Sequence, residues 1–95
     1  MIIHVTQEDI AHGIAMSKMF CPIARAVNRA MKEGGNTVQV KVVHDIIAVE
    51  IDNKGTVGVV DCPMNSDVVE WMDNYDAGQE VEPMDFDLFQ FVRIV

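Results

Sequence analysis

Cys21 is the best candidate for a nucleophile in this sequence. It directly precedes Pro22, which commonly begins a helix, and the free amides and dipole at a helix start lower a thiol pKa. Catalysis by a thiolate also needs a base, and the candidates are His4, His12 and His44. Spacing alone does not place any of them near Cys21, and free cysteines are among the most buried residue types. We therefore favour an inert, buried cysteine, with a reactive thiol as the alternative.

Metal and phosphate chemistry lack the spacing that they require. The histidines and cysteines stand at positions 4, 12, 21, 44 and 62, and they include neither a Cys-x-x-Cys nor a His-x-x-x-His pair. The acidic residues never follow the Asp-x-Asp-x-Asp-Gly pattern of a calcium loop. Gly34-Gly35 follows a predicted helix and lacks the lysine of a phosphate-binding loop. We therefore predict no metal, no cofactor and no catalytic residue.

A long series of acidic side chains is the most unusual feature of the sequence. From Asp67 to Asp87 the chain has eight Asp and Glu residues and no Lys or Arg. Such a series is usually a solvated face, and the alternative is a docking surface for a basic partner. Helical spacing groups three of the acids, and a chain reversal near Gly78 would bring two more alongside. The candidate partner-binding residues are Glu70, Asp73, Asp76, Glu80 and Glu82.

The composition describes one globular domain over residues 1–95. Apolar residues make up 49% of the chain and charged residues 23%. The 7 basic and 15 acidic residues give a net charge of −8, which disfavours binding to nucleic acid or to an anionic membrane. No secretory signal or membrane-spanning apolar run is visible, so we expect a cytoplasmic protein with reduced thiols.

Apolar residues at helical spacing predict three helices. The first spans about 7–12, where Thr6 and Asp9 form a capping box, and residues 14–20 either continue it irregularly or form a loop. The second spans about 22–32 and has an apolar stripe that begins at Ile23. The third spans about 67–76, and Trp71 in its stripe is expected to be a core residue.

Alternating residues predict strands at 1–5, 37–42, 46–51, 56–61 and 84–95. The middle three form an antiparallel meander, and the last pairs with residues 1–5. The fold class is therefore α+β. We expect a mostly antiparallel four- or five-stranded sheet with two main helices and one short N-terminal helix on one face.

Three segments resemble a set of small proteins that are encoded mainly by bacteriophages. They are residues 3–10 (Ile-His-Val-Thr-Gln-Glu-Asp-Ile) with Gly13, residues 21–26 (Cys-Pro-Ile-Ala-Arg-Ala), and residues 71–86 with Asp-Ala-Gly-Gln-Glu-Val-Glu-Pro near their centre. The resemblance implies a phage setting, the cytoplasm of a host cell and a small α+β fold. It carries no established activity, so no functional residue is transferred.

Two functions are compatible with these observations. The first is a non-enzymatic phage-type protein that binds a host or defence protein through its acidic surface. The alternative is a small-molecule or nucleotide binder, built as a homodimer, with Cys21 as a reactive thiol.

Overall fold

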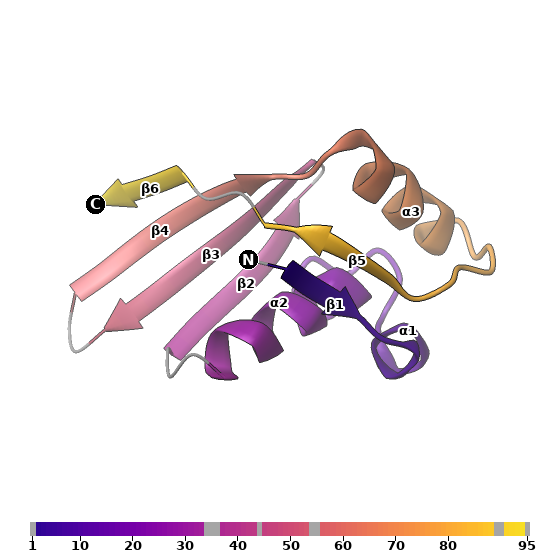
Figure 1. Cartoon of the computed structure of the whole chain (residues 1–95), viewed down its shortest axis with the longest axis horizontal. Helices are drawn as coiled ribbons and strands as arrows, with labels where there is room; N and C mark the ends of the chain where they lie inside the picture. The colour runs from indigo at the N-terminus through magenta and orange to yellow at the C-terminus, as the bar shows by residue number, and fades with distance from the viewer. Residues whose placement is uncertain (1, 34–36, 44, 54–55, 89–90, 95) are drawn as a thin grey trace.

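The strands are divided between two antiparallel sheets (Figure 1). The computed structural model describes residues 2–33, 37–43, 45–53, 56–88 and 91–94. In chain order the elements are β1 (Ile2–Val5), α1 (Gln7–His12), α2 (Pro22–Glu33), β2 (Thr37–Val43), β3 (Ile46–Asn53), β4 (Thr56–Pro63), α3 (Ser66–Asp76), β5 (Met84–Asp87) and β6 (Phe91–Ile94). One sheet has the order β2-β3-β4-β6, and the other pairs β1 with β5. The predicted α+β class and the β2-β3-β4 meander are confirmed.

The C-terminal strand differs from the prediction because it is two strands with different partners. β5 pairs antiparallel with β1, with Ile3 opposite Phe86, as expected for the two ends of the chain. β6 pairs instead with β4 in the larger sheet. The single predicted sheet is therefore wrong in this respect, since β1 and β5 form a separate two-stranded sheet.

Helix α2 buries its apolar stripe against both sheets. Ile23, Val27 and Met31 are buried, and the helix contacts β1 and β2. On β2, Val40 and Val42 are buried, as the alternation predicts. This helix therefore joins the two sheets through one core.

Local signals explain the helix starts. Thr6 and Asp9 form the predicted capping box at α1. The Cys21 thiol accepts from the Ala24 amide at 3.4 Å at the start of α2. At α3 the Asn65 side chain accepts from the amide of Val68, so the helix begins at Ser66, one residue earlier than predicted.

Helix α3 lies at the end of the larger sheet where β4 finishes (Figure 1). Val68 and Met72 reach the common core. Trp71 is half-buried and packs against this core rather than within it, so its assignment as a core residue is correct only in part. Its indole N–H donates to the carbonyl oxygen of Glu82 at 2.8 Å, and its ring stacks on Tyr75 with centroids 5.9 Å apart. The apolar stripe is wider than the core contact, and these two aromatic rings cover its margin.

None of the helices in the described ranges is long and apolar enough to cross a membrane.

Candidate protein-binding surface

Residues 14–20, between α1 and α2, form a loop that presents large apolar side chains to solvent. We call this segment the apolar loop. Met16 is 81% exposed and Phe20 is 58% exposed, and Ile14 and Met19 are exposed as well. Of the two forms that the sequence left open for this segment, the structure adopts the loop. Large exposed apolar side chains grouped in one short loop often mark an interaction site.

Hydrogen bonds, rather than apolar burial, order the apolar loop. The Ile14 amide donates to the Phe20 carbonyl at 2.8 Å, and the Phe20 amide donates to the Ser17 hydroxyl at 3.1 Å. The Lys18 carbonyl accepts from the Val42 amide at 2.7 Å, which attaches the loop to edge strand β2. The loop is therefore organised although its apolar side chains face water.

Met16 has a strained backbone. Its φ of 62° lies in the left-handed region, where no other described non-glycine residue is found. The Met16 amide donates to Oδ1 of Asp76 on α3 at 2.8 Å, and this bond helps to hold the conformation. Left-handed conformations cost a residue with a side chain about 1–2 kcal/mol, and such strain gathers at functional sites.

A groove of about 370 Å³ lies between the apolar loop, β2 and α3. We call it the loop–α3 groove. Three of its lining residues, Cys21, Val42 and Met72, are buried and form its floor. Asp73 and Asp76 also line it, as does Lys18 from the loop. The groove thus combines an apolar floor with two carboxylates.

The five predicted acidic residues fall into two groups on different sides of α3. Asp73 and Asp76 line the loop–α3 groove, and Glu70 lies beside Asp73 in the adjoining groove that Met64 and Val69 also line. Glu80 and Glu82 line a separate groove with Ile10 and Tyr75. The chain reversal places the backbone of Glu82 against Trp71. At 100° per residue, Trp71 lies about 200° around the helix axis from Asp73. The structure therefore does not bring Glu80 and Glu82 alongside the other three.

Cys21 is fully buried, as the favoured interpretation expects. Burial raises the pKa of its thiol, and this effect exceeds the opposing hydrogen bonds from the amides at the start of α2. Burial also raises the pKa of Cys62, and the nearby charge of Asp61 adds to the increase. Of the candidate bases, His44 lies outside the described residues. His4 is exposed and bonded to Asp85 at 2.8 Å.

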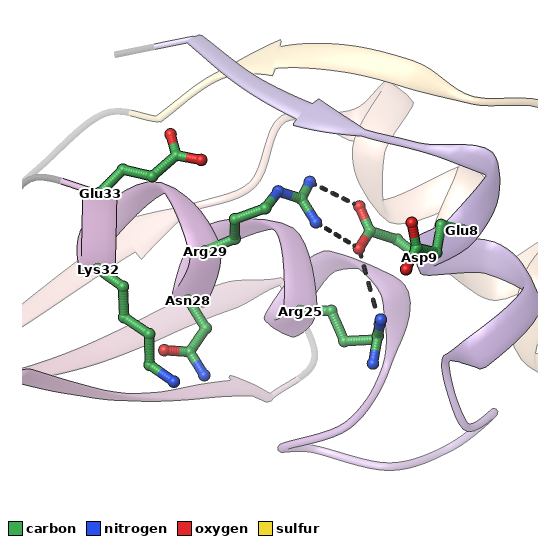
Figure 2. Close-up of a pocket in the computed structure, with 7 residues that line it drawn as sticks. All are labelled: Glu8, Asp9, Arg25, Asn28, Arg29, Lys32 and Glu33. Carbon is green, nitrogen blue, oxygen red and sulfur yellow. Dashed lines mark hydrogen bonds and ion pairs between the residues drawn. The ribbon is translucent and has the colours of Figure 1, made fainter.

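A second polar cluster surrounds Asp9, a fully buried acidic side chain (Figure 2). Arg29 binds both of its carboxylate oxygens, with Nη1–Oδ1 at 2.7 Å and Nη2–Oδ2 at 2.8 Å. The Thr6 amide donates to Oδ2 at 3.0 Å, and Arg29 Nη2 also donates to the His4 carbonyl at 2.9 Å. This cluster ties β1 and α1 to α2.

The Asp9 carboxylate is held in its charged form. Burial opposes ionisation, but the hydrogen bonds from Arg29 and Thr6 and the charge of Arg29 outweigh burial and lower the Asp9 pKa. A carboxylate with a lowered pKa and both oxygens occupied is a poor general base, so the cluster is structural. The sequence alone predicts Asp9 only as part of the capping box. The pairing with Arg29 joins residues 20 positions apart and leaves no local signal.

Among the described residues, no three His, Cys, Asp or Glu side chains are grouped so that they could hold a metal ion. Comparisons with protein families, with curated proteins and with solved structures found no match.

Proposed function

We propose that this protein is a non-enzymatic binding module that docks onto a protein surface bearing both apolar and basic groups. The docking surface consists of the apolar loop together with Asp73 and Asp76 of α3. The observation that carries the proposal is Met16, whose backbone is strained while its side chain is 81% exposed. A glycine at this position would avoid the strain, so the methionine side chain is retained for a contact outside the chain.

Charge supports a basic partner. The protein has a net charge of −8, and the segment from Asp67 to Asp87 has no lysine or arginine. Exposed acids beside an apolar contact accelerate association with a basic surface and repel acidic proteins. The partner that we propose is a host or defence protein in the cytoplasm of an infected cell, in keeping with the resemblance to phage proteins.

The chemistry of the buried groups favours binding over catalysis. The Cys21 thiol is buried with a raised pKa, which opposes its use as a nucleophile. Both oxygens of Asp9 are engaged by Arg29. Within the described part of the chain, the thiol-based alternative therefore has no supporting geometry.

The test compares partner capture by variants of exposed apolar residues. Immobilised parent protein is expected to retain a stoichiometric partner from host-cell lysate. The Met16→Gly and Phe20→Ser variants are expected to lose it, because each removes an exposed side chain of the apolar loop. Ile2→Ser is the matched control, since Ile2 is 51% exposed but lies on β1. Equal capture by all four proteins would contradict the proposal.

Met16→Gly separates function from folding. Glycine adopts a positive φ without strain, so this change should not lower the free energy of unfolding, measured by urea titration. A variant that is at least as stable as the parent and yet binds less partner identifies the methionine side chain as a contact. Loss of stability with retained binding would refute both parts of this reasoning.

A further inference from the structure

We propose that the loop–α3 groove receives one lysine or arginine side chain of the protein partner. The aliphatic stem would lie along Val42 and Met72, above the fully buried Cys21, and the cationic head would meet Asp73 and Asp76. The inference rests on the proposed docking function and specifies which group of the partner anchors it.

The size of the groove fits a single side chain. Its volume of about 370 Å³ is near the lower end of the roughly 300–1,000 Å³ that small-ligand sites enclose. This volume holds one long side chain, and the loop, the edge of β2 and α3 line it. A folded segment of the partner would have to rest on the rim instead.

The floor selects a side chain with an apolar stem. Cys21 is fully buried, and the small part of Val42 and Met72 that stays open, at most 8% of each, is apolar. Lysine and arginine place their methylene groups on such surfaces while the charged head stays at the polar margin. Short polar side chains would leave the floor uncovered.

The two carboxylates select a cation. Within the described part of the chain, Asp73 forms no ion pair, and Asp76 uses Oδ1 for the Met16 amide. Lys18 lines the groove but forms no ion pair with either acid, so the three side chains leave a net charge of −1. A neutral apolar side chain would desolvate the carboxylates without compensation, and an acidic one would be repelled.

The test uses isolated side chains as probes, so that it does not depend on the partner. Nα-acetyl-arginine amide and Nα-acetyl-lysine amide are titrated into the isotopically labelled protein, and amide chemical shifts are followed by NMR. We expect saturable shifts around Lys18, Val43 and Asp73, with Kd on the order of millimolar. Nα-acetyl-norleucine amide, which has the stem without the charge, should bind at least several-fold more weakly.

A matched pair of variants locates the charge. Asp73→Asn should weaken binding of both cationic probes several-fold, because it removes one of the two carboxylates that line the groove. Glu70→Gln makes the same charge change on the same helix but outside this groove, and it should leave the affinity unchanged. Equal binding of norleucine, or equal effects of the two variants, would overturn the assignment of a cation site.

The results also distinguish this inference from the function on which it rests. If the cationic probes do not bind but Met16→Gly still abolishes partner capture, the groove is not the anchor and the docking surface stands. If the probes bind with the expected dependence on Asp73 but no partner depends on the apolar loop, the cation site stands and the docking function fails.

Discussion

Replacing Asp9 with asparagine should destabilise the fold more than any other single charge change. The substitution removes a buried charge whose oxygens accept from Arg29 at 2.7 and 2.8 Å and from the Thr6 amide at 3.0 Å. One oxygen would become an amide nitrogen, and that donor would face the donors of Arg29. The amide oxygen can still accept from the Thr6 amide, and the Thr6 hydroxyl still accepts from the amide of residue 9, so the capping box is kept and the main loss is the ion pair.

The expected loss of stability follows from the unequal burial of Asp9 and its arginine partners. Removing one member of a buried ion pair costs about 3–5 kcal/mol, because the other charge stays buried and unpaired. Here the remaining members are Arg29 and Arg25, whose Nε lies 3.6 Å from Oδ1 of Asp9, and their side chains are 41% and 35% exposed and can be rehydrated. We therefore expect a loss of about 2–3 kcal/mol, a large part of the roughly 5–15 kcal/mol that stabilises a typical domain.

The assay is urea-induced unfolding followed by circular dichroism, with Glu8→Gln as the control. Glu8 is an exposed acid beside Asp9 in the same helical turn, and its neutralisation should change stability by about 0.5 kcal/mol or less. Equal effects of the two substitutions would refute the structural role of the Asp9–Arg29 pair.

The same pair determines a dependence of stability on pH. The folded state lowers the Asp9 pKa below its ordinary value of 3.8, so the unfolded chain binds the proton more readily. The stabilisation is therefore complete above the unfolded pKa and is lost as the pH falls through the folded pKa. The difference between parent and Asp9→Asn should shrink as the solution is acidified below about pH 4. A difference that stays constant to the lowest pH at which both proteins fold would contradict the lowered pKa.

Three further predictions concern packing and reactivity. Tyr75→Phe removes a hydroxyl that lies 2.9 and 3.0 Å from two backbone carbonyls at the end of α1, and it should lower the free energy of unfolding by about 1 kcal/mol in urea titrations; unchanged stability would show that this bond is not formed. Gly13→Ala would place a Cβ 2.7 Å from a backbone oxygen and should cost about 1–3 kcal/mol, whereas Gly58→Ala meets no atom within 4 Å and should not destabilise through a clash; equal losses would refute the close approach. Cys21 is buried and the pKa of its thiol is raised, so iodoacetamide should label it only as fast as the protein opens. Cys21→Ser should retain partner capture. Rapid labelling or lost capture would restore the reactive-thiol alternative.

The helix limits followed from the sequence because their signals are local. Thr6 with Asp9, and Pro22 after Cys21, fix helix starts within a few residues of chain. The β2-β3-β4 meander followed from alternation and from short connections between neighbouring strands. Each of these predictions depends on contacts between residues that are close together in the sequence.

The features that define the candidate site depend on contacts between distant residues. The bond from the Met16 amide to Asp76 joins positions 60 residues apart, and no local pattern marks Met16 for a positive φ. The acidic series was visible in the sequence, but its division into two groups depends on the packing of Trp71 against the backbone of Glu82. The split between β5 and β6 likewise depends on which strand each one meets.

Site-specific photo-crosslinking tests the central claim most directly, namely that the apolar loop is the docking surface. A benzophenone amino acid is placed at Phe20 on the loop, or at Ile2 on β1 as an equally exposed control, and each protein is irradiated in host-cell lysate. We expect one discrete protein adduct from position 20, reduced when Asp73→Asn is added, and no such adduct from position 2. Adducts of the same identity and yield from both positions, or none from position 20, would contradict it.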